Sequence, residues 1–350
     1  MREILLNKKI VDDFTLNFLA EISQDFTDQS LSQAAFDKLK QFVIAGKTVR
    51  GSLFFSAAKA FAENEATLKT EDLLYVASSL EIIHSGLLIH DDIIDQDQLR
   101  RGQASIWQQY QTESENSHFK KTDNYGQSLA LCLGSICLYL AQLALDKTSF
   151  SAPLKDQLRQ NLNQEIIRTY FAEMLDSKIT ALREDPSMTE VLEMYRFKTA
   201  RYTFSLPLQL AGLVNNLPQA EINSLILLGE KLGLIFQIKD DEISLFAHQE
   251  KSGKSFASDL REGKKTIFYL TLLPKLNPTE KEFFKKNFGQ AKIDSKAIEQ
   301  LQALFSKYSL KEVGKLVAEL SLEAQALIKE VKVGQNLLLA LLDFNLQRQN

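Results

Sequence analysis

The sequence predicts an all-α fold, and three observations support this prediction. Glycine and proline together make up roughly 6 % of the chain, about half their usual share, and both are unfavourable inside helices. Apolar residues recur at helical spacing almost without a break, and no useful stretch alternates as a strand does. No linker rich in Pro, Gly or Ser divides the chain. We therefore expect one domain over residues 1–350, a bundle of about ten or more helices.

Changes in apolar periodicity and polar stretches set the bounds of the expected helices. Polar residues at 111–124 and 248–258 predict loops. Pro186 biases Asp185 away from helical geometry, and Ser187 suits the N-cap of the next helix. In chain order, the expected helices cover residues 10–24, 30–45, 48–63, 70–95, 125–146, 154–182, 188–214, 219–246, 263–272, 279–287, 295–307, 310–328 and 332–347.

The composition is typical of a globular chain, with 45 % apolar and 25 % charged residues. The net charge is −4 with no sustained basic block, which argues against a nucleic-acid partner. The N-terminal segment lacks the apolar core of a signal peptide. Polar side chains interrupt the apolar run near residues 129–145, so we expect a buried helix there and no membrane span. We expect a cytoplasmic protein whose two cysteines, Cys132 and Cys137, are buried core thiols.

An acidic cluster occurs twice, at residues 90–95 (HDDIID) and 237–242 (QIKDDE). Each follows a long apolar run with helical spacing. Asp91 and Asp95 are spaced i, i+4, so they lie on one helix face. Carboxylates on an apolar helix need a partner, because unpaired buried charge is costly. Oxygen-only ligands favour magnesium, so the pattern predicts a cavity where metal ions are held between acidic helices.

Basic residues accompany these acidic clusters. Arg100 and Arg101 follow the first cluster, and Lys254 follows the second. Lys47 and Arg50 are spaced i, i+3, on one face of a helix. Any one of these charges alone is most simply a solvated group or a weak surface ion pair. Acids that hold metal beside bases that hold phosphate together predict a diphosphate site.

His84 lies seven residues before Asp91, two helical turns back on the same face. A lone histidine in an apolar stretch is most often a satisfied core residue. On the stripe that ends in Asp91 it could instead face a phosphate. His90 lies on a different face, and we interpret it as structural.

In order and spacing, these residues resemble the trans-isoprenyl diphosphate synthases, the polyprenyl synthetase family. The resemblance extends from about Gly46 to Thr266, most of the chain. It rests on five elements taken together, since none would be specific alone. They are Gly46-Lys47-x-x-Arg50, the first aspartate-rich motif within Glu81 to Asp95, Leu99-Arg100-Arg101-Gly102, Lys198-Thr199, and the second aspartate-rich motif within Phe236 to Asp241.

The resemblance implies a bundle around a central substrate cavity, a homodimer, and a role for each matched residue. Asp91, Asp95 and Asp240 would bind about three magnesium ions shared with substrate diphosphate, supported by Asp92, Asp241 and Asp176. The implied catalytic set is Asp91, Asp92, Asp95, Lys198, Asp240 and Asp241. The allylic diphosphate would contact Arg100, Lys198, Thr199, Gln237 and Lys254, and isopentenyl diphosphate would contact Lys47, Arg50, His84 and Arg101.

The second motif departs from the family pattern at Ser244, where an aspartate is usual. Members with a non-acidic residue there are still expected to bind metal through the first position, which is Asp240 here. We therefore expect the first cluster to be the more sensitive to mutation.

The implied chemistry is ionisation of the allylic diphosphate, attack by the double bond of isopentenyl diphosphate, and loss of a proton. The product would grow below Asp91, where one helical turn of 5.4 Å is comparable to one isoprene unit. The positions expected to gate its length are Leu87, Ile83 and Leu80, with Gly86 leaving space beside Leu87. None of these is aromatic, so we expect a product of about twenty carbons or longer.

Several alternatives remain open at this point. A short-chain farnesyl diphosphate synthase differs only in the product pocket. A catalytic or non-catalytic subunit of a two-chain polyprenyl synthase is suggested by Ser244. A class I terpene cyclase shares the first acidic motif, but Lys47, Arg50 and Arg101 argue against it because a cyclase needs no second substrate. A purely structural helical protein explains neither the paired acids nor their basic neighbours.

Overall fold

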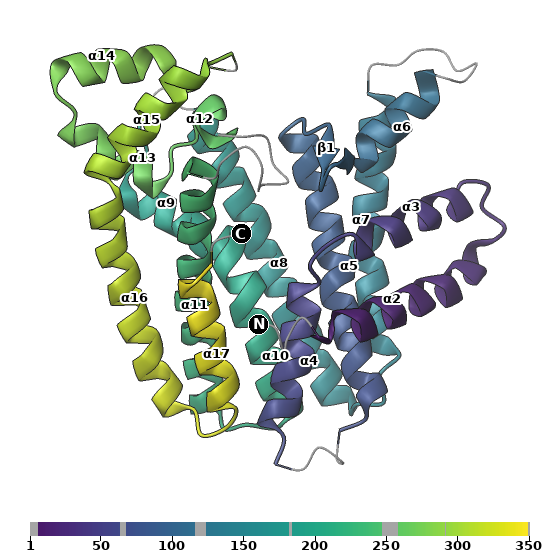
Figure 1. Ribbon diagram of the computed structural model, residues 1–350. Helices are drawn as coiled ribbons and strands as arrows, with labels where there is room; N and C mark the ends of the chain where they lie inside the picture. Colours follow the sequence, from purple (N-terminus) through teal and green to yellow (C-terminus); the bar gives the residue numbers. More distant parts are fainter. Residues whose placement is uncertain are drawn as a thin grey trace. The chain divides into compact units, whose positions relative to one another are not determined.

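The computed structural model describes residues 6–63, 68–115, 124–181, 184–246, 258–290 and 292–348, and it confirms the all-α prediction (Figure 1). Two short strands, β1 (Leu99–Arg100) and β2 (Gln103–Ala104), pair as an antiparallel hairpin. The helical elements are α2 (Lys8–Ile22), η1 (Ser23–Phe26), α3 (Ser32–Ile44), α4 (Val49–Phe61), α5 (Thr70–Ile94), α6 (Ile106–Glu115), α7 (Tyr125–Asp146), α8 (Ala152–Ala181), α9 (Met188–Tyr195), η3 (Arg196–Ser205), α10 (Leu206–Val214), α11 (Gln219–Phe246), α12 (Ser258–Glu262), α13 (Ile267–Leu272), η4 (Leu273–Lys275), α14 (Pro278–Asn287), α15 (Ser295–Tyr308), α16 (Leu310–Glu330) and α17 (Gln335–Leu346).

The chain divides into two compact units. Unit 1 comprises Met1–Asn163 and Pro207–Leu217, and unit 2 comprises Gln164–Leu206 and Pro218–Asn350. One boundary therefore falls within α8 and the other within α10. Each unit has its own apolar core, and a single domain over the whole chain stays a prediction.

Unit 1 is built around α5, which packs against α7, α4 and α2. Its apolar residues Val76, Leu80 and Ile83 are at most 1 % exposed. The contact with α7 is close because two glycines meet there. A Cβ on Gly86 would lie 2.7 Å from the carbonyl oxygen of Gly134, so neither helix has room for a larger residue at this crossing.

Unit 2 is built around α11, which packs against η3, α16 and α17. Leu225, Leu232 and Ile238 are fully buried along it. Gly229 and Gly233 bring the backbone of α11 against Ser205 and Ala200 of η3. The helix that carries the second acidic cluster is therefore held in direct contact with η3.

Three predicted elements differ from the structure. Residues 106–115 form α6, so the loop predicted from residue 111 begins later, and residues 116–123 lie outside the described part of the chain. The helix predicted over 188–214 contains a π-helical segment, η3, between α9 and α10. The helix predicted over 263–272 begins at Ile267, because Gly263 adopts a φ of +69° and separates α12 from α13.

One cysteine prediction was wrong. Cys137 is buried as expected, whereas Cys132 is exposed. Both lie on α7, and five residues amount to about 140° of rotation around a helix. The two thiols therefore point to different faces, of which only one packs into the core.

Two described helices, α5 and α7, are long and apolar enough to cross a membrane by length and composition. The relevant window of α5 is 83 % buried in the protein and that of α7 is 44 % buried. Core helices of soluble proteins meet the same criteria, so this is weak evidence for a span. The absence of a membrane span stays a prediction.

Candidate functional site

A basic cluster in unit 1 forms where the hairpin β1–β2 meets the connection between α3 and α4. The hairpin turns through Arg101 and Gly102, which have φ values of +55° and +76°, as a type I′ turn requires. The guanidinium of Arg101 donates to the carbonyl of Phe42 at 3.0 Å. It also lies against Gly46, where an added Cβ would be 2.5 Å from its Nη2 atom. The glycine of the Gly46-Lys47-x-x-Arg50 element is thus needed for Arg101 to occupy this place.

A buried carboxylate lies beside these bases. Glu81 on α5 is 3 % exposed and accepts a hydrogen bond from the backbone N–H of Gly51 at 2.7 Å. Burial raises its pKa, while that hydrogen bond and the charges of Arg50 and Arg101 oppose the rise. Sequence reasoning did not assign Glu81 a role, although it lies one turn before His84 within the matched motif.

His84 belongs to the same cluster. Burial lowers its pKa well below the ordinary value, and the nearby positive charges of Arg50 and Arg101 lower it further. The imidazole is therefore neutral at pH 7, with one nitrogen available to donate and one to accept. The structure brings together Arg50, His84 and Arg101 as predicted, while Lys47 is an exposed neighbour on the connection to α4.

The first acidic cluster lies at the C-terminal end of α5 and is tied to the hairpin by Arg100. The guanidinium donates to Asp92 Oδ1 at 2.5 Å and to Asp91 Oδ2 at 2.8 Å. The indole N–H of Trp107 donates to the carbonyl of Asp92 at 3.0 Å and fixes the end of the helix. Asp95 is the exposed C-cap residue of α5.

Asp92 is the most perturbed of these carboxyl groups. Burial raises its pKa to about 7, against the opposing effect of Arg100, and the charges of Asp91 and Asp97 raise it further. Its Oδ2 atom is buried without a hydrogen-bond partner among the described residues. One arginine therefore does not fully compensate the negative charge here, and a further cation would be favoured.

In unit 2 the predicted residues form two connected groups. Lys198 on η3 pairs with Asp176 at 2.6 Å and with Glu173 at 3.0 Å, both on α8. The neighbouring Thr199 hydroxyl donates to Gln237 Oε1 at 2.9 Å. Their position on a π-helix is notable, since π segments within α-helices are frequent at functional sites.

The second acidic cluster continues this network on α11. Gln237 donates to Asp241 Oδ1 at 2.9 Å, and the Tyr195 hydroxyl donates to the other oxygen of Asp241. Asp241 is 5 % exposed, so these bonds satisfy a buried carboxylate. Tyr195 was not identified from the sequence, because a lone tyrosine at the end of a helix carries no distinctive pattern.

Asp240 has a partner from the far end of the chain. Arg348, just beyond α17, donates to Asp240 Oδ1 at 2.7 Å. Its guanidinium lies 3.7 Å from the centroid of the Phe236 ring and its side chain is 8 % exposed. Sequence reasoning missed Arg348, since the contact joins residues 108 positions apart.

The positions expected to gate product length lie on α5, and one of them needs correction. Leu80 and Ile83 are buried and Leu87 is half-buried. Gly86 does not leave open space, because the backbone of Gly134 and the side chain of Cys137 fill it. Gly86 is five residues from Asp91, so it faces about 140° away around the helix.

Two findings limit how the metal prediction can be met. Among the described residues, no three His, Cys, Asp or Glu side chains gather closely enough to hold a metal ion. Carboxylate oxygens nonetheless suit magnesium, which commonly takes one or two of them together with water and substrate phosphate. Lys254 lies outside the described residues, so its predicted contact with a diphosphate stays a prediction.

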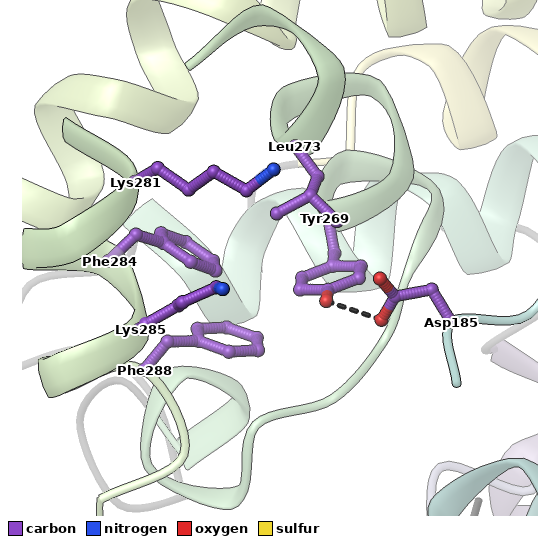
Figure 2. A pocket seen from close by; sticks show the side chains of 7 residues that line it. All are labelled: Asp185, Tyr269, Leu273, Lys281, Phe284, Lys285 and Phe288. Carbon is purple, nitrogen blue, oxygen red and sulfur yellow. Dashed lines mark hydrogen bonds between the residues drawn. The ribbon is translucent and has the colours of Figure 1, made fainter. Parts of the chain in front are cut away.

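Unit 2 also contains a separate cavity of about 350 Å³, lined by the residues drawn in Figure 2. Tyr269 donates to Asp185 Oδ1 at 2.6 Å on one side, and Lys281 and Lys285 line the other. None of the predicted site residues lines this cavity. The chemistry is therefore argued from the side-chain clusters above.

Residues 32–305 match the model of the family described as polyprenyl synthetase. The chain belongs to the polyprenyl synthetase family. It is a prenyltransferase, an enzyme of the isoprenyl diphosphate synthase type, as its motifs predicted. The matched range contains both acidic clusters and the Gly46-Lys47-x-x-Arg50 element.

Individual relatives agree with this assignment. Geranylgeranyl diphosphate synthase of Saccharolobus solfataricus is 26 % identical over 358 residues, covering 97 % of this chain and 99 % of that protein. The short chain isoprenyl diphosphate synthase of Methanothermobacter thermautotrophicus is 27 % identical over 300 residues, covering 86 % and 84 %.

Solved structures agree in fold. The chain resembles geranylgeranyl pyrophosphate synthase from Corynebacterium glutamicum with a TM-score of 0.88 and 25 % identity, covering 97 % of this chain and 98 % of that one. That protein was crystallised with isoprenyl diphosphate and magnesium.

Proposed function

We propose that this prenyltransferase condenses isopentenyl diphosphate with an allylic prenyl diphosphate. One observation carries the proposal most of the way. Within unit 1, α5 bears the acidic cluster at Asp91 and, two turns back, His84 beside Arg50 and Arg101. A single rigid helix thus presents carboxylates for a metal and a neighbouring group of bases for an anion.

In this proposal the basic residues hold and orient the two substrates. Lys47, Arg50 and Arg101 bind the diphosphate of isopentenyl diphosphate, and neutral His84 donates a hydrogen bond to it. Arg100, Lys198, Thr199, Gln237 and Lys254 bind the allylic diphosphate.

Magnesium held by Asp91, Asp95 and Asp240, about three ions in all, would supply positive charge that stabilises the departing diphosphate. The apolar residues of α5 exclude the water that would otherwise quench an allylic cation. Neutral groups such as His84 avoid adding a competing charge beside that cation.

We propose a product of about twenty carbons or longer. Leu80, Ile83 and Leu87 are aliphatic, so no aromatic ring on this face stops the growing chain. Relatives named as geranylgeranyl diphosphate synthases support this choice. Relatives named as farnesyl diphosphate synthases, 29 % identical over 223 residues, keep the fifteen-carbon alternative open.

Incubation of the purified enzyme with farnesyl diphosphate, isopentenyl diphosphate and Mg²⁺ tests the product length. We expect chromatography to show a product of about twenty carbons or more, and Leu87→Phe to shorten it by about one isoprene unit. Accumulation of only the fifteen-carbon product from shorter primers would instead identify a farnesyl diphosphate synthase. A hydrocarbon formed without consumption of isopentenyl diphosphate would favour a cyclase, and activity only after addition of a partner chain would favour a subunit.

We also propose that the enzyme is a cytoplasmic homodimer. An apolar face of α7 supports the dimer, since Leu131, Ile136 and Tyr139 are 54 %, 43 % and 73 % exposed. Light scattering should give twice the chain mass for the wild type and a smaller mass for Tyr139→Asp. A monomeric wild type, or recovery of the native enzyme in membranes after cell fractionation, would contradict this proposal.

A further inference from the structure

Thr48 has an unusual backbone conformation in the middle of the Gly46-Lys47-x-x-Arg50 element. Its φ and ψ are +50° and +45°, in the left-handed region, and the residue is 3 % exposed. A β-branched residue rarely adopts this conformation, because its side chain crowds the backbone. Such strain persists only where the surrounding structure holds it in place.

Two side chains from α2 hold Thr48. Its hydroxyl donates to Asp12 Oδ1 at 2.6 Å and accepts from Lys8 Nζ at 3.3 Å. Lys8 and Asp12 also form an ion pair, and the Asp12 side chain is only 14 % exposed. The three residues make a closed network in which each contacts the other two.

The same lysine reaches the other end of the connection between α3 and α4. Lys8 Nζ donates to the carbonyl of Ile44, the last residue of α3, at 3.0 Å. That carbonyl belongs to the final helical turn, where no further amide of the helix can bind it. Lys8 therefore fixes where the connection leaves α3, and Thr48 fixes where it enters α4.

Thr48 does not use its hydroxyl as an N-cap residue usually does. It occupies the N-cap position of α4 but makes no side-chain cap hydrogen bond, although threonine at this position commonly accepts one from the helix backbone. The hydroxyl is instead committed to Asp12. The observed network thus takes the place of local capping, which indicates that the direction of this turn is what it maintains.

We propose that Lys8, Asp12 and Thr48 are positioning residues that orient Lys47 and Arg50 toward the diphosphate of isopentenyl diphosphate. This inference rests on the proposed function, because it assigns that diphosphate to Lys47 and Arg50. Lys47 immediately precedes Thr48, and Arg50 lies in the first turn of the helix that Thr48 begins. A change in the backbone at Thr48 would redirect both charges without removing either.

Asp12→Ala and its neighbour Asp13→Ala make a matched pair of variants. Asp13 is exposed and pairs only with Lys9 among its printed contacts, on the outer side of α2. We expect Asp12→Ala to raise the KM for isopentenyl diphosphate about tenfold, with kcat and the KM for the allylic substrate within about twofold of wild type. Asp13→Ala should leave all three values unchanged.

Variants of Thr48 separate the hydroxyl from the backbone strain. Thr48→Ser keeps the hydroxyl and should behave as wild type, whereas Thr48→Val should raise the same KM about tenfold. Thr48→Gly fits the left-handed conformation without strain, so it folds even if Thr48→Val does not, and we expect the same rise. Unchanged KM values in both Asp12→Ala and Thr48→Gly, or equal losses in every kinetic parameter, would overturn the proposal.

A binding measurement distinguishes failure of this inference from failure of the proposed function. Calorimetric titration with inorganic pyrophosphate in EDTA reports on the basic cluster without any turnover. Weaker binding by Asp12→Ala, about tenfold, would support the network even in a chain that forms no product. Equal binding by wild type and Asp12→Ala, or no binding by either, would reject the network whether or not isopentenyl diphosphate is consumed.

Discussion

The two acidic clusters differ in where their positive partner comes from. Asp91 and Asp92 are paired with Arg100, which follows Asp92 by eight residues in the adjoining hairpin. Asp240 is paired with Arg348, which lies 108 residues further along the chain. The side chain of Asp92 is 1 % exposed and that of Asp240 is 38 % exposed. The first cluster is therefore a buried local unit, whereas the second depends on the last turn of the described chain.

The largest expected difference between the clusters is in catalysis. We expect Asp91→Ala to lower kcat about 1,000-fold or more and Asp240→Ala by a smaller factor, because the first motif keeps all three acids. Steady-state assays at saturating Mg²⁺ and substrates measure both losses. Asp97→Ala and Glu242→Ala are matched controls for nearby charge and should remain active. A greater loss in Asp240→Ala than in Asp91→Ala would reverse the ranking.

The two arginine partners should differ in their effect on stability. Arg100→Ala leaves the buried Asp92 carboxylate without its partner and should lower the free energy of unfolding by about 3 kcal/mol. Arg348→Ala exposes a carboxylate that already meets solvent and should cost about 1 kcal/mol or less. Urea unfolding monitored by circular dichroism measures both values. Similar losses in the two variants would show that the second cluster is as well buried as the first.

The pH dependence of stability tests the burial of Asp92 directly. Its pKa is raised from 3.8 to about 7 in the folded chain, so between these values the folded chain holds a proton that the unfolded chain has released. The contribution of Asp92 is therefore fully present below about pH 4 and is lost as the pH rises to 7, by up to about 1.4 kcal/mol per pH unit. In EDTA, Asp92→Asn should remove this decline, while Asp97→Asn should retain it. An unchanged slope in Asp92→Asn would contradict the raised pKa.

The smallest expected effect is at the missing acid of the second cluster. Ser244→Asp restores the usual motif, but we expect kcat to change by less than about threefold, because Asp240 alone provides the first-position carboxylate. The apparent Mg²⁺ affinity from the same assay should change little. A large gain in either quantity would mean that the second cluster limits the enzyme.

Much of the fold and half of the site network follow from local sequence. The apolar periodicity predicted α5 and α11, and the spacing of Asp91, Arg100 and Arg101 placed them in one cluster, since all three lie close in the chain. Contacts between distant segments left no such pattern. The pairing of Arg348 with Asp240 and the hold of Asp12 on Thr48 join residues 108 and 36 positions apart.

Glycines and helix ends explain most of the remaining errors. Gly86 suggested open space in the sequence, but its partner Gly134 lies on another helix and fills that space. Gly263 was included in a helix although its positive φ ends one. The π-helical segment from Arg196 to Ser205 keeps apolar periodicity close enough to an α-helix that the sequence pattern did not distinguish them.

The dependence of isopentenyl diphosphate incorporation on metal tests the central claim most directly. Purified wild type and Asp91→Ala would be incubated with geranyl diphosphate and radiolabelled isopentenyl diphosphate, in Mg²⁺ and in EDTA. We expect labelled prenyl diphosphate from the wild type in Mg²⁺, and almost none in EDTA or from Asp91→Ala under either condition. Incorporation that persists undiminished in EDTA, or an Asp91→Ala variant as active as wild type, would contradict the account.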